Sequence, residues 1–215
     1  EDDAMNIKHY MTQNVVTINP DTRVTEAVDL MEEHDFHSLP VVKSHSFVGL
    51  VTEDLIKNKT SSAATSLSIY ELNYLLDKTT VKEIMEKNVQ TTSQDLQIEE
   101  AAILMVDKNI TVLPVIDEGK NVNGIITYKD IFRALIELSG YQSGGDRLII
   151  EVEEDSIGVL DDITSVLAHE DISISHIFVN RIEEHIEITI QISEKVGNKA
   201  KVALIEKGYR TGVIN

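Results

Sequence analysis

The sequence predicts an α/β protein of the α+β kind, in which a β-α-β-β-α unit occurs twice and a different β-α-β-β-α-β domain follows. Three observations lead to this prediction. The stretch "MEEHDFHSLPVV", residues 31–42, is matched by "MVDKNITVLPVI", residues 105–116. The composition then turns to Gly and Ser in "SGYQSGGD". The strand and helix patterns beyond that segment match neither copy.

The repeat determines the organisation of residues 6–140. The matched pairs are Met11 and Met85, Met31 and Met105, and Pro40 and Pro114 at an offset of 74 positions, and Gly49 and Gly124 at an offset of 75. Two copies are too few for a solenoid, so we expect two half-units around a pseudo-twofold axis with a cleft between them. The expected segments are a first repeat at 6–58, a linker helix at 59–79 and a second repeat at 80–140.

Each copy shows the same order of elements. A short extended piece, residues 15–18 or 89–92, precedes a helix whose apolar residues recur three and four positions apart. These apolar residues are Val24, Ala27, Val28 and Met31 in the first copy, and Ile98, Ala101, Ala102 and Met105 in the second. A strand, a turn, a second strand and another helix follow. Between the copies we expect a polar loop at 57–66 and a short helix opened by a capping box of Ser68 and Glu71.

Residues 146–215 form the different domain. Strands are expected at 146–154, 172–179, 185–192 and 209–214, and helices at 155–170 and through Ala200, Ala203 and Leu204. The first helix carries an apolar stripe of Val159, Leu160, Ile163, Val166 and Leu167. The third strand places Ile186, Ile188, Ile190 and Ile192 on one face. This pattern predicts an antiparallel sheet covered on one face by two helices.

The amino-acid composition argues against several classes of function. With 37 acidic and 19 basic side chains the formal charge is −18, which disfavours nucleic acid and anionic membranes as partners. Cysteine is absent, so disulfides, thiolate nucleophiles and cysteine-ligated zinc are excluded. No long apolar run and no signal sequence is present, which predicts a soluble cytoplasmic protein. The opening "EDDA" is left out of the fold prediction as a scar or frayed tail.

The two copies resemble a pair of CBS domains from about Asn6 to Leu138. The "LPVV" and "LPVI" strands and the "GLVT" and "GIIT" strand endings carry this resemblance, because they occur twice in register. The tail resembles an ACT domain, a regulatory ferredoxin-like fold that commonly binds amino acids. The motif that supports this resemblance is "DSIGVL", which has Ile157 where the family usually has proline. The segment "EDISI" departs from the family's Gly-x-Asn-Ile pattern. The combination is similar to the AcuB-like acetoin utilisation proteins.

The CBS resemblance implies an adenine nucleotide, AMP- or ATP-like, as a regulatory ligand in the cleft, with no cofactor. Thr127 would contact a phosphate and Asp130 the ribose hydroxyls. The residue pattern supports this, because Thr127 ends a strand and opens a helix whose free N–H groups favour an anion. Lys129 and Arg133 would add positive charge. Alternatively, Thr127 is an ordinary N-cap and Asp130 complements the helix dipole.

The expected nucleotide site has a strong and a weak half. The residues expected to line the adenine slot are Thr91, Ile110, Thr111 and Leu113, and Pro114 is counted in the same nucleotide site. The first half-site consists of Thr17, His37, Leu39, Thr52 and Asp54. Pro40 and Pro114 are also explained as strand-start residues. In the first copy Thr52 and Asp54 are two positions apart rather than three, and a helix turns about 100° per residue. The first half-site is therefore expected to be the weaker one.

The ACT resemblance implies a site for a small amino acid at Asp155, Gly158, Val159 and Ser173. A tight turn that merely opens a helix explains the same glycine. Dimerisation through the sheet is the stronger expectation, because sheet edges need partners.

Enzyme classes are disfavoured. His34 and His37 lack a third metal ligand in register, and Ser143 does not stand in a nucleophile elbow. No P-loop or dinucleotide fingerprint occurs, and no metal site is expected. We therefore expect a non-catalytic regulatory homodimer that senses an adenine nucleotide and acts on a partner protein; the ACT resemblance adds a small amino acid as a second ligand. The alternative is a structural or adaptor dimer whose pockets stay empty.

Overall fold

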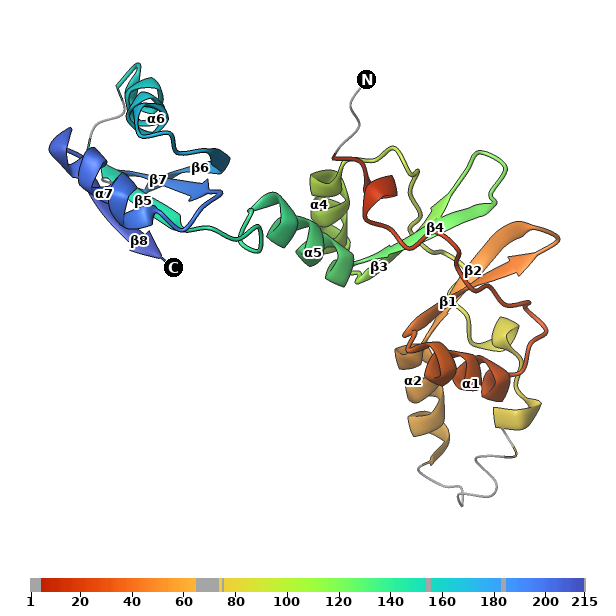
Figure 1. The fold of residues 1–215 in the computed structure, drawn as a ribbon. Coiled ribbons are helices and arrows are strands. Elements are labelled where there is room, and N and C mark those ends of the chain that lie inside the picture. Colours follow the sequence, from red (N-terminus) through yellow and green to blue (C-terminus); the bar gives the residue numbers. More distant parts are fainter. Residues whose placement is uncertain (1–4, 65–73, 75, 154–155, 183–184, 215) are drawn as a thin grey trace. The chain divides into compact units, whose positions relative to one another are not determined.

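The computed structural model describes residues 5–64, 74, 76–153, 156–182 and 185–214 (Figure 1). These residues belong to two compact units, residues 1–131 and residues 132–215. The first contains the repeats up to the beginning of the last helix of the second copy, and the other contains a four-stranded sheet. The chain is therefore an α+β protein.

The first repeat combines two helices with a two-stranded antiparallel sheet. Its elements are the 3₁₀ helix η1 (Ile7–His9), α1 (Val24–His34), β1 (Ser38–Lys43), β2 (Ser46–Thr52) and α2 (Glu53–Ala64). α1 buries Val24, Ala27 and Met31 in the hydrophobic core that β1 and β2 share with it. It ends at Asp35, whose left-handed conformation (φ 54°) is one that short polar side chains tolerate.

The second repeat has the same construction. Its elements are η2 (Val81–Glu83), α4 (Ile98–Lys108), β3 (Val112–Ile116), β4 (Val122–Thr127) and α5 (Tyr128–Leu138). Its α4 ends at Asn109, again left-handed (φ 50°). The change of repeat offset from 74 to 75 falls at the hairpin turns. Ser44 and His45, both with positive φ, join β1 to β2, whereas residues 117–121 join β3 to β4.

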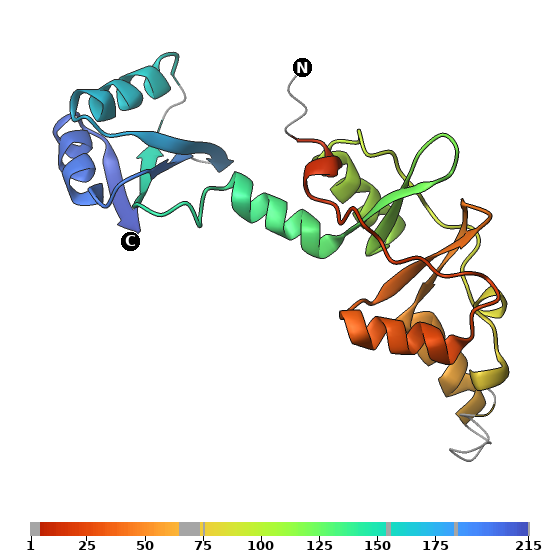
Figure 2. The ribbon, with the colours of Figure 1, turned by 45° about the vertical axis from the view of Figure 1, so that its right-hand side comes forward.

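The two repeats exchange their leading segments. Thr12 pairs with Ile125 of β4, and Glu86 pairs with Leu50 of β2, each through two backbone hydrogen bonds of 2.9 Å. A second set of bridges, Asn6 with Gln97 and Arg23 with Thr80, follows the same symmetry. Figure 2 shows the N-terminal segment, in red, running past β4 before it reaches α1. Each repeat is thus completed by a segment that precedes the other in sequence.

Two equivalent glycines permit this exchange. A Cβ atom at Gly49 would lie 2.6 Å from the carbonyl oxygen of Glu86. A Cβ atom at Gly124 would lie 2.6 Å from the sulfur of Met11 and 2.9 Å from the carbonyl oxygen of Thr12. The repeated Gly in "GLVT" and "GIIT" is therefore required by the passage of the crossing segment over the hairpin.

The C-terminal domain is a single sheet with two helices. Its elements are β5 (Arg147–Val152), α6 (Val159–His169), β6 (Ile174–Ile182), β7 (His185–Ile192), α7 (Gly197–Glu206) and β8 (Arg210–Ile214). The strand order is β6-β7-β5-β8 and all pairs are antiparallel, which is consistent with a ferredoxin-like domain. The core comes from the alternating face of β5 and β7 and from Ile163, Val166 and Leu167 of α6.

Three sequence-based expectations need correction or fall outside the described residues. The polar loop expected at 57–66 is wrong for residues 57–64, which continue α2, because "KNKTSSAA" contains no Gly or Pro to end the helix. Leu160 of the expected apolar stripe is 42% exposed rather than buried. The capping box of Ser68 and Glu71 lies outside the described residues. Within the described residues, no helix has the length and apolar character needed to cross a bilayer.

The crossing geometry predicts that Gly49→Ala destabilises the protein by about 1–3 kcal/mol, because the methyl group would overlap the Glu86 backbone, which cannot rotate away. Urea unfolding measures the change. The matched control is Gly212→Ala in β8, where the added methyl group meets only the Ile149 carbonyl oxygen at 3.9 Å. Equal stability of the two variants would contradict the proposed tight crossing.

Candidate functional site

The strand-to-helix junctions of the two repeats are equivalent in fold but differ in hydrogen bonding. β2 ends at Thr52 and β4 at Thr127, and each threonine directly precedes a helix. The Thr52 hydroxyl accepts a bond of 3.3 Å from the Leu55 N–H. Thr127 instead donates its N–H and its hydroxyl to Oδ2 of Asp130, at 2.8 and 2.7 Å. Asp130 is 7% exposed, whereas Asp54 is exposed to solvent.

A cavity of about 410 Å³ lies between the two junctions. Its lining residues are His37, Ser38, Thr52, Glu53 and Asp54 from the first repeat, and Thr111, Val112, Thr127, Tyr128 and Lys129 from the second. Each member of the first set is the sequence counterpart of a member of the second, at the repeat offset of 74 or 75. The cavity therefore lies on the pseudo-twofold axis that relates the repeats.

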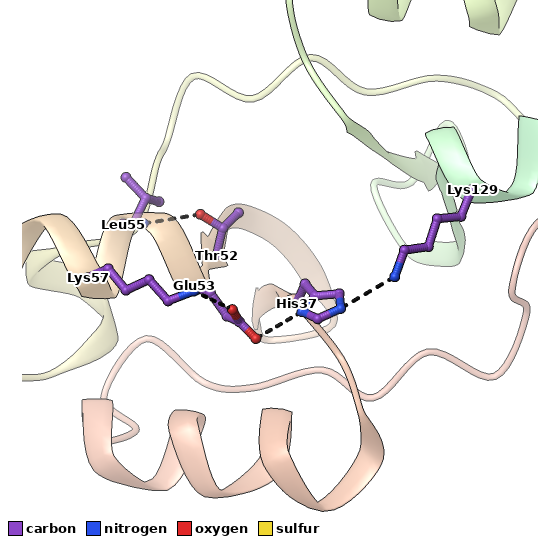
Figure 3. Close-up of polar contacts among 6 residues, drawn as sticks. All are labelled: His37, Thr52, Glu53, Leu55, Lys57 and Lys129. Carbon is purple, nitrogen blue, oxygen red and sulfur yellow. Dashed lines mark hydrogen bonds and ion pairs between the residues drawn. The ribbon is translucent and has the colours of Figure 1, made fainter.

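The two repeats supply different charges to equivalent positions of this cavity. His37 donates through Nδ1 to Oε1 of Glu53 at 2.8 Å, and Oε2 of Glu53 accepts from Lys57 at 2.7 Å. The hydrogen bonds from Lys57 and then from His37 lower the pKa of Glu53, so this carboxylate is ionised at neutral pH. Figure 3 shows the His37 ring between Glu53 and Lys129, whose Nζ lies 3.5 Å from Nε2.

The remaining predicted nucleotide residues are distributed around this centre. Leu39 and Leu113 are fully buried and Pro114 is buried, so these three belong to the hydrophobic interior. Thr91 and Ile110 are half-buried, and Thr17 is exposed. Arg133 of α5 lines another cavity, with Ile136, Glu137, Gln142 and Ser143. The central cavity thus unites His37, Thr52 and Asp54 with Thr111, Thr127 and Lys129.

Sequence reasoning missed four lining residues and one partner. The lining residues are Ser38, Glu53, Val112 and Tyr128, and Lys57 is the partner of Glu53. The repeat alignment could have identified the lining residues, because the counterpart of each lining residue in one repeat also lines the cavity in the other. Glu53 and Tyr128, for example, directly follow the two threonines.

The C-terminal domain has a cavity of its own, of about 370 Å³. Gly158, with φ 96°, and Val159 line it at the beginning of α6. Its other lining residues are Val152, Ser156, Leu160, Asp161, Val179, Arg181, Ile186 and Ile188. Asp155 lies outside the described residues. Ser173 is exposed, its carbonyl oxygen accepts from the Ser193 N–H, and it does not line this cavity.

The histidines considered as metal ligands and the serine considered as a nucleophile have other neighbours. His34 stacks on Phe36 at a centroid distance of 5.3 Å, while His37 is bonded to Glu53. Ser143 donates to the Gly140 carbonyl oxygen at 2.6 Å. In the parts of the chain that the structure describes, no group of three or more His, Cys, Asp or Glu side chains is placed to hold a metal ion.

The CBS domain family matches residues 7–59 and 81–137, which are the two repeats. The chain belongs to the CBS-domain family. The uncharacterized protein MJ0188 of Methanocaldococcus jannaschii is 27% identical over 169 residues, which cover 73% of this chain and 58% of that protein. This chain therefore spans little more than half of that relative's length.

Two solved structures resemble the CBS region. The CBS domain pair of protein MJ0100, in complex with 5′-methylthioadenosine and S-adenosyl-L-methionine, has a TM-score of 0.52 and 28% identity, and covers 60% of this chain and 98% of that one. A protein assigned to acetoin utilization, AcuB from Vibrio cholerae, has a TM-score of 0.54 and 25% identity, and covers 64% and 94%. The prediction of a CBS pair is thus confirmed.

Proposed function

We propose that this protein is a regulatory sensor that binds an adenine nucleotide between its two CBS repeats. The observation that carries the proposal is the cavity on the pseudo-twofold axis, which collects hydroxyl, imidazole and ammonium groups from both copies. The likeness to the CBS pair of MJ0100, solved with two adenosine derivatives, supports this ligand class. AMP, ATP, a dinucleotide and S-adenosylmethionine all belong to it.

The second repeat is better prepared for such a ligand than the first. Thr127 fixes the buried Asp130 through two bonds to one carboxylate oxygen. We propose that this carboxylate, held beside the cavity by Thr127, accepts hydrogen bonds from the ribose hydroxyls of the ligand. Lys129, the residue directly before Asp130, lines the cavity and is suited to phosphate. Asp54 is exposed and has a different spacing from its threonine, which supports one nucleotide per chain.

Ligand binding would act by changing how often the two repeats adopt each of their possible arrangements. A nucleotide that contacts both repeats favours the arrangement of repeats that it fits best, and this preference passes to a partner protein. The proposal includes no catalytic step, and we propose that the protein acts in the cytoplasm. The competing proposal is a structural or adaptor dimer that regulates its partner without a small molecule, which nucleotide titration distinguishes.

We also propose that the C-terminal domain is an ACT domain and that the architecture is AcuB-like. The β-α-β-β-α-β order and the glycine turn before α6 support this assignment. The cavity at that turn has an apolar floor, with Val152, Ile186 and Ile188, and charged groups at Asp161 and Arg181. This combination suits a small amino acid.

We propose that the protein assembles as a homodimer. A difference in surface residues between the two repeats supports this assembly. On α4, Ile103 and Val106 are 59% and 79% exposed, while their counterparts on α1 are Asp29 and Glu32. An apolar surface that one copy of a repeat keeps and the other replaces with charges is typical of an interface. On α5, Tyr128, Phe132, Leu135 and Ile136 are likewise exposed along one side of the helix.

The edge of the C-terminal sheet offers a further contact. β6 is an edge strand and exposes Ile177, Phe178, Val179 and Ile182. Unpaired backbone groups beside exposed apolar side chains favour pairing with another strand. We propose that this edge contributes to the same dimer.

Calorimetric titration with AMP is expected to give one site per chain. Asp130→Ala should weaken binding about 10- to 150-fold, the loss of a charge-assisted bond of about 1.5–3 kcal/mol. Asp54→Ala is the matched control and should bind nearly as the wild type does. Since Asp130 also caps α5, Asp130→Asn and a urea unfolding curve separate loss of binding from loss of structure. Two equal sites, or greater damage from Asp54→Ala, would contradict the one-site proposal.

If the C-terminal cavity takes an amino acid, a thermal-shift screen of amino acids should find a stabilising one. Gly158→Val should abolish that shift, because a β-branched residue at φ 96° distorts the turn, while the AMP shift remains. Gly208→Val is the control, since it carries the same strain at φ 98° outside the cavity lining. Equal effects of both variants would assign the loss to general strain in the domain.

Light scattering at micromolar concentration should return a dimer. Val106→Glu, which copies the first repeat's Glu32, should shift the mass toward the monomer, because a charge cannot be buried unpaired in an apolar interface. Val106 is 79% exposed, so folding of the chain should tolerate the change. Glu32→Gln is the control. A wild-type monomer would refute the dimer, and an unchanged dimer in Val106→Glu would exclude the α4 face.

A further inference from the structure

Two basic side chains from different repeats meet at the central cavity. His37 stands just before β1, and Lys129 lies in the first turn of α5. Their nearest nitrogen atoms, Nε2 and Nζ, are 3.5 Å apart (Figure 3). Among the described residues, Lys129 forms no ion pair with a carboxylate. The imidazole is thus the group that the ammonium faces.

The position of the imidazole proton follows from Glu53. Its ionised carboxylate can only accept a hydrogen bond, so Nδ1 of His37 carries the proton of the bond of 2.8 Å. Nε2 is then the unprotonated nitrogen, and it presents its lone pair to Lys129. A second proton on this ring can enter only at Nε2, directly beside the ammonium group.

The charges around the cavity determine how a second proton on His37 would affect anion binding. Glu53 and Asp54 line the cavity, and Asp130 lies behind Thr127. Lys129 and, beyond Glu53, Lys57 oppose these three carboxylates. His34 stacks on Phe36, and Tyr128 adds a phenol to the lining. A proton on His37 would add a positive charge beside Lys129, where an incoming anion could accept from both groups.

Protonation and anion binding therefore favour each other here. A proton on Nε2 of His37 would stand next to the Lys129 ammonium, and the repulsion between these two positive charges opposes that protonation. An anion between them accepts from both and removes the repulsion. By linkage, a ligand that prefers the protonated ring takes up a proton when it binds.

We propose that His37 and Lys129 form a proton-coupled anion site that holds the phosphate group of the ligand across both repeats and binds it more tightly as the pH falls. This inference rests on the nucleotide function proposed above and adds a second input to it. The phosphate would connect the first repeat to the second, and the proton would set the strength of that connection. The sensor then responds to nucleotide and pH together.

The test compares AMP with 5′-methylthioadenosine, an adenosine derivative without phosphate, by calorimetry at about pH 6.5, where an ordinary imidazole is about half protonated, and at about pH 8, where it is almost fully neutral. AMP should bind about tenfold more tightly at the lower pH, the gain from a charge-assisted bond, and 5′-methylthioadenosine equally at both. Titrations in buffers of different ionisation enthalpy should show proton uptake with AMP. His37→Gln should abolish both effects, and His9→Gln, an exposed histidine outside the cavity, should retain them.

The outcomes separate this inference from the nucleotide function. Binding of AMP with no pH effect, or with the same pH effect in His37→Gln, overturns the anion site and leaves the nucleotide function standing. If neither of these ligands binds, and ATP, a dinucleotide and S-adenosylmethionine do not bind either, the nucleotide function fails, and sulfate, which does not titrate in this range, becomes the probe. Sulfate should then stabilise the wild type more than His37→Gln at about pH 6.5, at ionic strength matched with chloride. Equal stabilisation overturns the anion site as well.

Discussion

Reciprocal backbone pairing between the two repeats determines where the candidate site can be. Thr12 bonds to Ile125 and Glu86 to Leu50, so neither hairpin is complete without a segment that precedes the other repeat. Because both crossings obey one pseudo-twofold axis, the junctions at Thr52 and Thr127 must face the same central cavity. Gly49 and Gly124 make the crossings possible, since any side chain there would meet the passing segment. The cavity is thus a consequence of the exchange and not of any single functional residue.

Within this symmetric frame, small sequence changes give the halves different chemistry. The fold places His37 opposite Thr111 and Asp54 opposite Lys129. One position of difference separates the buried Asp130, bonded twice to Thr127, from the exposed Asp54. The interior of each repeat cannot diverge in this way, because α1 and α4 must bury equivalent residues, Met31 and Met105 among them. Divergence is therefore confined to the cavity and the outer surface, which are the parts that contact ligands and partners.

The sequence carried most of the fold but only part of the site. Repeated apolar spacing predicted α1 and α4, and alternating isoleucines predicted β7 at its observed bounds, because both signals arise from burial. The end of α2 was missed because a polar helix without Gly or Pro resembles a loop in composition. Leu160 was expected in the core but is partly exposed. Which apolar position of a helix is exposed depends on how far the elements packed against that helix extend. Likewise, the bond from His37 to Glu53 joins residues 16 positions apart, and no periodic pattern encodes such a contact.

The hydrogen bonds of His37 connect its charge to the contact between the two repeats. Its backbone carbonyl accepts from the Glu53 N–H at 3.1 Å, and its ring bonds the Glu53 side chain, so the imidazole is fixed to the beginning of α2 at two points. In the second repeat the Thr111 carbonyl accepts from the Tyr128 N–H at 3.0 Å, next to Lys129. Equivalent backbone bonds therefore tie His37 to the beginning of α2 in the first repeat, and Thr111 to the beginning of α5, which carries Lys129, in the second. A change in the charge between them acts on the junction of the repeats itself, whereas a charge change on a flexible loop would be absorbed locally.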